Sequence, residues 1–86
     1  KENNNKKAIE YINKAISLGE KLNNIELLSN LYEILAEIYE KMGEYNKSIS
    51  VLKNLVNLKS KLNLLDDIDK IHNKINYLNK KLSGSK

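Results

Sequence analysis

Apolar residues recur along the chain at steps of three and four, the spacing of amphipathic helices. In the first half they form two sets: Ile9, Ile12, Ala15, Ile16 and Leu22, then Leu28, Leu31, Leu35, Ile38, Tyr39 and Met42. This spacing places one stripe of each helix toward a core, and the alternation typical of strands is absent. The pattern predicts four helices, at about residues 3–22, 25–42, 45–62 and 66–82.

Three short segments predict where the helices begin and end. Asn23 with Glu26, and Asn63 with Asp66, have the spacing of an N-terminal capping box, so we expect both asparagines to begin helices. Gly43 predicts the end of the second helix, because glycine tolerates the left-handed turn at a helix C-terminus. Such short connections make neighbouring helices antiparallel.

The two halves of the chain repeat each other at an offset of forty residues. Ile9 aligns with Ile49, Leu35 aligns with Ile75, and the run Lys-Leu-Asn at 21–23 recurs at 61–63. A period that holds through two segments is typical of stacked helical units, each unable to bury its apolar face alone. We therefore expect an all-α protein with one domain over residues 1–82 and a flexible or engineered tail at 83–86.

The last predicted helix has a second interpretation. Steps of four and three residues give it a heptad seam that could pair with a second chain as a coiled coil: Leu64, Ile68, Ile71, Ile75, Leu78 and Leu82. No glycine or proline enforces a turn before this helix, so one continuous helix over about residues 45–82 also stays open.

Composition limits the chemistry that the chain can perform. Its 86 residues are 41% hydrophobic, enough for one small core, and they include no cysteine and a single histidine. Disulfides, thiolate metal sites and histidine-rich metal centres are therefore excluded. No apolar run approaches the roughly 20 residues that span a bilayer. We expect a soluble, cytoplasmic protein without a membrane partner.

The net charge of +4 is concentrated in the second half, where nine lysines accompany four acids. A basic half could indicate nucleic-acid binding. However, the chain has no arginine for bidentate phosphate contacts and neither tryptophan nor phenylalanine for stacking on bases. We therefore expect no nucleic-acid partner.

Three groups of polar residues could carry chemistry, and each has a simpler explanation. His72 has no serine, cysteine or paired carboxylate at a catalytic spacing. The glutamates of 33–40 form one stripe but lack the Glu-x-x-His helix of a carboxylate-bridged metal site. The aspartates of 66–69 fit the acidic first turn that a helix dipole favours. Because a glycine-rich phosphate loop is also absent, we expect neither an enzyme nor a cofactor.

A family motif runs from Leu31 to Ile49. It has a large aromatic, a leucine before a small residue, a tyrosine, a turn glycine, a further aromatic and another small residue: Tyr32, Leu35, Ala36, Tyr39, Gly43, Tyr45 and Ser48. This motif resembles the tetratricopeptide repeat, and with half-repeats on both sides the resemblance covers about residues 6–82. The period of about forty residues, and Ser60 near the place of the usual closing proline, mark a longer type of repeat.

The resemblance implies antiparallel helix hairpins stacked as a right-handed superhelix. It also implies a non-catalytic scaffold that binds a partner peptide or helix in a concave groove. In this family the first helix of each unit lines the groove, which predicts these groove residues: Asn30, Glu33, Ile34, Glu37, Glu40, Lys41, Lys70, Asn73, Lys74, Tyr77, Lys80 and Lys81. Glu33 and Glu37 argue against the family's clamp for a C-terminal carboxylate. An acidic stripe beside a basic one favours a partner of mixed charge.

A self-associating module is the main alternative. Four helices with open ends expose apolar faces, which a longer array or a second copy would cover. The longer repeats also resemble those of bacterial regulators and sensors. The second interpretation is therefore a homodimerising or signal-relay module of a larger bacterial regulator, which uses its terminal helix faces.

Overall fold

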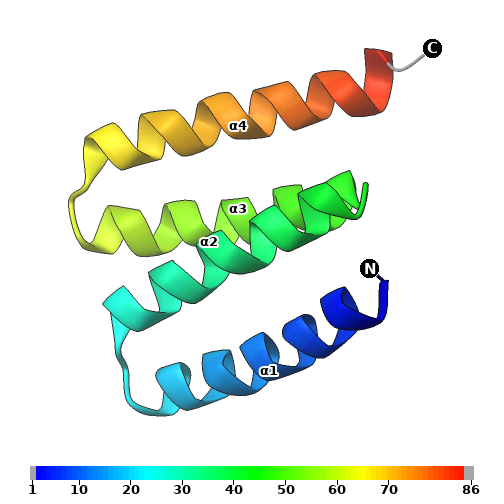
Figure 1. Ribbon diagram of the computed structural model, residues 1–86. Helices are drawn as coiled ribbons and strands as arrows, with labels where there is room; N and C mark the ends of the chain where they lie inside the picture. The colour runs from blue at the N-terminus through cyan, green and yellow to red at the C-terminus, as the bar shows by residue number, and fades with distance from the viewer. Residues whose placement is uncertain (1, 85–86) are drawn as a thin grey trace.

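The computed structural model describes residues 2–84, which form four α-helices and no strand. The helices are α1 (Glu2–Lys21), α2 (Ile25–Lys41), α3 (Tyr45–Lys61) and α4 (Leu65–Gly84). Short turns join antiparallel neighbours, so the start of α1 and the end of α4 lie at the same end of the molecule (Figure 1). The all-α architecture expected from the sequence is confirmed, and α3 and α4 are separate helices.

The three turns share one backbone conformation. Their central residues, Asn23, Gly43 and Asn63, have φ angles of 54°, 80° and 58°. In each turn the next amide donates a hydrogen bond to the carbonyl five residues earlier, at 2.8 to 3.1 Å. This is the long bond of a Schellman motif, which closes a helix C-terminus. Because the motif recurs every twenty residues, the helices reverse direction at regular intervals.

The predicted capping boxes at Asn23 and Asn63 are wrong. Both asparagines follow the ends of α1 and α3 in the left-handed conformation, which asparagine adopts more readily than other residues with a side chain. The N-cap of α2 is Asn24, whose Oδ1 accepts a hydrogen bond from the Leu27 amide at 3.1 Å. Gly43 occupies the left-handed position after α2, as predicted.

Helix α4 continues two residues beyond its predicted end, to Gly84. The Ser83 hydroxyl donates a hydrogen bond to the carbonyl oxygen of Asn79 at 3.1 Å, one turn earlier. The first two residues of the expected tail are therefore helical, and residues 85 and 86 lie outside the described residues.

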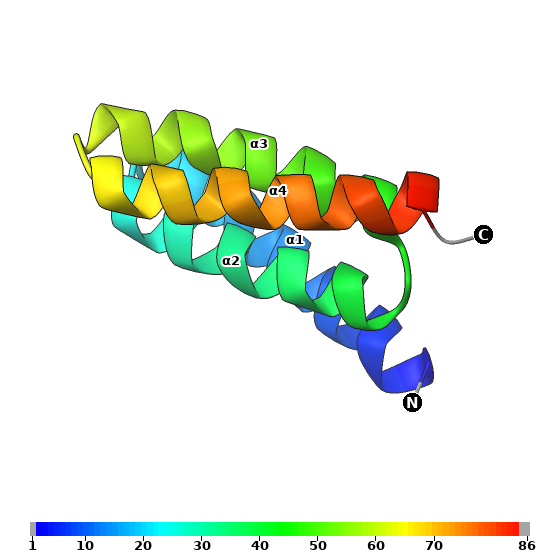
Figure 2. The ribbon, with the colours of Figure 1, turned by 90° about the horizontal axis from the view of Figure 1, so that it is seen from above.

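The helices form a thin slab whose Cα atoms extend over 43 × 34 × 13 Å. Within residues 2–84, the backbone of each helix approaches only its neighbours in the sequence closely, so α2 and α4 meet only through side chains. Seen from above, α2 and α3 lie on opposite sides of the slab, with α4 beside α3 (Figure 2). Because α3 follows α2 and packs against both α2 and α4, a space remains between α2 and α4.

The core lies where α3 meets its two neighbours. Leu55 of α3 belongs to one buried cluster together with Ile71, Ile75 and Leu78 of α4. The last three residues are the centre of the heptad seam. Because α3 already covers them within this chain, the interpretation in which this part of the seam pairs with a second chain is wrong.

Candidate functional site: a groove between α2 and α4

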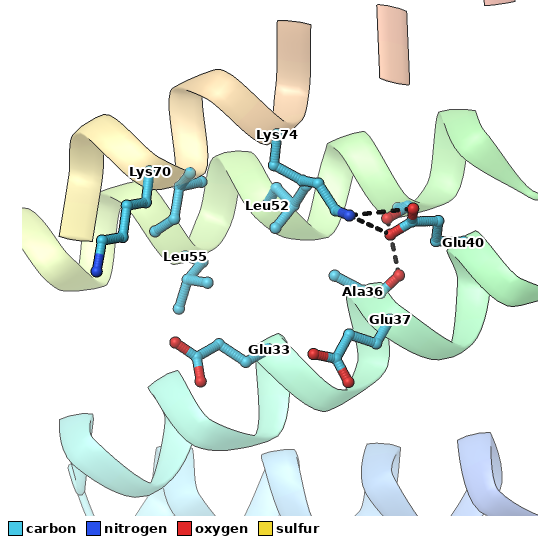
Figure 3. A pocket seen from close by; sticks show the side chains of 10 residues that line it. Glu33, Ala36, Glu37, Glu40, Leu52, Leu55, Lys70 and Lys74 are labelled. Carbon is cyan, nitrogen blue, oxygen red and sulfur yellow. Dashed lines mark hydrogen bonds and ion pairs between the residues drawn. The ribbon is translucent and has the colours of Figure 1, made fainter. Parts of the chain in front are cut away.

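A groove of about 340 Å³ opens between α2 and α4 (Figure 3). Helix α3 forms its floor, and the two flanking helices form its walls. The lining residues are Ser48, Leu52 and Leu55 of α3, Glu33, Ala36, Glu37 and Glu40 of α2, and Lys70, Ile71 and Lys74 of α4. One wall is therefore acidic, the other is basic, and much of the floor is apolar.

Small residues bring α2 and α3 together beneath the groove. The buried Ser48 donates its hydroxyl hydrogen bond to the carbonyl oxygen of the buried Ala36, at 2.8 Å. A larger side chain at either position would separate the two helices. The close crossing leaves Leu52 and Leu55 of α3 at the bottom of the groove.

Two charged bridges join the walls. The Lys74 ammonium lies 2.9 Å and 3.1 Å from the two carboxylate oxygens of Glu40. Outside the groove lining, Lys59 of α3 lies 3.7 Å from a carboxylate oxygen of Glu33 and 3.5 Å from one of Asp67. Lys59 is only 9% exposed, so its ammonium depends on these two carboxylates for compensation.

Glu37 and Lys70 line the groove from opposite walls (Figure 3). Neither has an ion-pair partner within the described part of the chain. Both side chains are exposed, so they stay hydrated. An incoming polypeptide can consequently pair with these two charges without first breaking an existing ion pair.

An aromatic residue extends the basic wall. The half-exposed Tyr77 has the ammonium nitrogens of Lys74 and Lys81 each 5.4 Å from its ring centroid, within the range of cation–π attraction. The pKa of Lys81 is raised above its usual value, chiefly by a side-chain hydrogen bond with Tyr77. Tyr45 and Glu40 also contribute to that rise.

The predicted groove residues occupy two edges of each helix, and only the facing edges meet. Five of them line the groove together, from both walls: Glu33, Glu37, Glu40, Lys70 and Lys74. On α2, the edge that faces the groove carries the three glutamates. On α4, the edge that faces the groove carries Lys70 and Lys74, which lie forty residues after positions 30 and 34. The remaining predicted residues do not line the groove: Asn30, Ile34, Lys41, Asn73, Tyr77, Lys80 and Lys81.

Sequence reasoning missed the floor of the groove and the buried lysine. Leu52 and Leu55 of the third predicted helix were not assigned to the groove, although their spacing places them on one face with Ser48. Lys59 continues that face, four residues after Leu55. A lysine on an otherwise apolar stripe was the available signal, because a charge at a core position requires a partner.

The groove offers little for catalysis. The hydroxyl of Ser48 is buried and donates to Ala36, and the exposed His72 does not belong to the lining. Among the described residues, no three histidine or acidic side chains converge as metal ligands would. None of the described helices combines the length and hydrophobicity that crossing a membrane requires.

Comparison with known families matches residues 1–21 and 29–62 to the tetratricopeptide repeat. The second match spans α3 and most of α2, and the first covers α1. The chain belongs to the tetratricopeptide repeat family, whose members generally mediate protein–protein interactions and are typically non-catalytic. Neither a curated protein nor a solved structure matches it.

Proposed function

We propose that this chain is a non-catalytic interaction module that binds a peptide or helix of a partner protein in the groove between α2 and α4. The observation that carries the proposal is the pair of unbridged opposite charges, Glu37 and Lys70, above an apolar floor. Opposite charges on facing walls fix the direction of a bound segment, and the floor supplies buried apolar area.

The lining also defines the partner. A bound segment should place a basic residue near Glu37, an acidic residue near Lys70 and an apolar side chain over Leu52 and Leu55. A free C-terminal carboxylate fits less well, because Glu33, Glu37 and Glu40 line one wall. Hydrogen bonds and charges determine the order of residues in the bound segment, whereas apolar burial on the floor contributes most of the affinity.

Selection of a random 20-residue peptide library on the immobilised chain tests this proposal. We expect the enriched peptides to combine one apolar position with a basic and an acidic residue at a fixed spacing. Their binding should weaken about tenfold in Glu37→Lys and in Lys70→Glu. Peptides whose two charges are exchanged should bind better to the double variant Glu37→Lys/Lys70→Glu than to the wild type.

Matched controls are available on other faces of the molecule. Glu10→Lys on α1 and Lys53→Glu on α3 change exposed charges that do not line the groove. They should leave peptide binding within about twofold of the wild type at 0.15 M salt. Failure to enrich any peptide, or equal losses in control and groove variants, would refute the proposed site.

A further inference from the structure

A second cavity of about 350 Å³ opens between the start of α2 and the end of α3. We call it the Ser29 pocket, and its lining consists of Glu26, Ser29, Asn30, Lys59, Leu62 and Leu64. It adjoins the groove, because Lys59 lines the pocket and its ion-pair partner Glu33 lines the groove. Glu26 precedes Glu33 by about two helical turns, so the pocket continues the acidic wall of the groove.

Two buried polar side chains of the pocket can still form hydrogen bonds. Ser29 is 2% exposed, and its Oγ has no hydrogen-bond partner in the part of the chain that the structure describes. Lys59 is also buried, and its ion pairs with Asp67 and Glu33, at 3.5 Å and 3.7 Å, are longer than the roughly 2.7–2.9 Å of a charge-assisted hydrogen bond. A buried polar group without a partner is costly, so both side chains favour a ligand group that pairs with them.

The charges around the Ser29 pocket select against an ionic ligand of either sign. A cation would lie against the ammonium of Lys59. An anion would join three carboxylates: that of Glu26 in the lining and those of Glu33 and Asp67 beside Lys59. A neutral group avoids both repulsions, and hydrogen bonds can offset its burial. The pocket therefore favours a neutral group that both accepts and donates hydrogen bonds.

We propose that the Ser29 pocket binds the side-chain carboxamide of a glutamine. The carboxamide oxygen would accept hydrogen bonds from the Lys59 ammonium and the Ser29 hydroxyl, and the amide nitrogen would donate to the Glu26 carboxylate. The two methylene groups of the glutamine stem would contact Leu62 and Leu64. That this glutamine belongs to the segment bound in the groove rests on the proposed function, whereas the chemistry of the pocket does not.

A small compound tests the pocket without any groove-binding segment. The probe is N-acetylglutamine amide, titrated into the isotope-labelled full chain and followed by NMR. We expect saturable shifts of the Ser29 and Asn30 amides and of the Leu62 methyl groups, with a Kd on the order of a few millimolar. The corresponding glutamate and lysine compounds present an anion and a cation on similar stems. They should bind at least about tenfold more weakly.

Three variants assign the binding to the buried polar groups. Ser29→Ala should weaken binding of the glutamine compound about fivefold, because one hydrogen bond is lost. Lys59→Met keeps the buried stem but removes the charged donor, so it should weaken binding at least about tenfold. Ser50→Ala is the matched control, because Ser50 of α3 is exposed and does not line the pocket. It should bind like the wild type.

Three results would overturn the inference: no saturable shift at Ser29, equal binding of the three compounds, or binding that Ser29→Ala leaves intact. Glu37→Lys separates this test from that of the groove, since it should leave binding of the glutamine compound unchanged. Selected peptides that bind a chain to which the glutamine compound does not bind would refute the pocket alone. Binding of the compound without enrichment of any peptide would refute the groove alone.

Discussion

Lys59 shows how one side chain can join three helices. It projects from α3 toward Glu33 of α2 and Asp67 of α4, at 3.7 Å and 3.5 Å. Its counterpart forty residues earlier is Gly19, where an added Cβ would lie only 3.0 Å from Leu28. The equivalent positions 19 and 59 are therefore packed in different ways. The repeat predicted where residue 59 lies on its helix, but not that a lysine would fill the space that the first unit closes with glycine.

The stem of Lys59 should matter more to stability than its charge. We expect Lys59→Met to keep the free energy of unfolding within about 1 kcal/mol of the wild type, because Met retains most of the buried stem and half-exposed partners lose little. Lys59→Ala should cost about 2 kcal/mol, since it leaves a void. Urea unfolding measures both. Equal losses in the two variants would show instead that the ion pairs carry the stability.

The ionisation of Tyr32 makes the stability of the fold depend on pH in the alkaline range. Burial raises its pKa above the ordinary value of 10.0, and the nearby Glu20 carboxylate adds to the rise. The folded state therefore favours the neutral phenol over the phenolate. The resulting stability is complete below pH 10 and is lost as the pH rises through the folded-state pKa.

The unfolding free energy of the wild type should accordingly fall above pH 10, and Tyr32→Phe should fall less steeply. The exposed Tyr11 provides the control Tyr11→Phe, which should follow the wild type. Chemical denaturation between pH 8 and about pH 11.5 distinguishes the three proteins. Parallel curves for Tyr32→Phe and the wild type would contradict this role of Tyr32.

At the scale of helices, the hydrophobic pattern was sufficient to predict all four elements to within two residues at each end. It was not sufficient to assign the roles of asparagine. Asn23 and Asn63 occur where a helix ends and the next begins, and asparagine suits both a left-handed C-terminal position and an N-cap. Tertiary closure of each hairpin decides between them, and in both cases it selects the left-handed position.

The crossing of α2 and α3 gives a test at the same scale. Ala36→Leu should lower the free energy of unfolding by about 1–3 kcal/mol, because Ala36 is buried against Ser48 and has no room for a longer side chain. Asn76→Leu introduces a leucine at the position of α4 that is equivalent to Ala36, where the side chain is exposed. It should leave stability within about 0.5 kcal/mol of the wild type, and similar losses in thermal unfolding would mean that the crossing is not tightly packed.

At the scale of the molecule, the groove follows from the order in which the helices pack. Because α3 separates α2 from α4, each of these helices presents only one edge to the groove. Sequence reasoning could name the inward face of each unit, which contains Glu37 and Lys70. It could not choose between the two edges of that face, because Asn30 and Asn73 have the same helical spacing as the residues that line the groove. That choice depends on the angle between units, which no local pattern encodes.

The most direct test of the groove is a titration of the isotope-labelled chain with a library-selected peptide, followed by NMR. We predict that the largest shifts fall on the methyl groups of Leu52 and Leu55 and on the amides around Glu37 and Lys70. The exposed residues Tyr11 and Leu18 of α1 should stay unchanged. Shifts confined to α1, or spread evenly over all four helices, would contradict the claim that this module recognises its partner between α2 and α4.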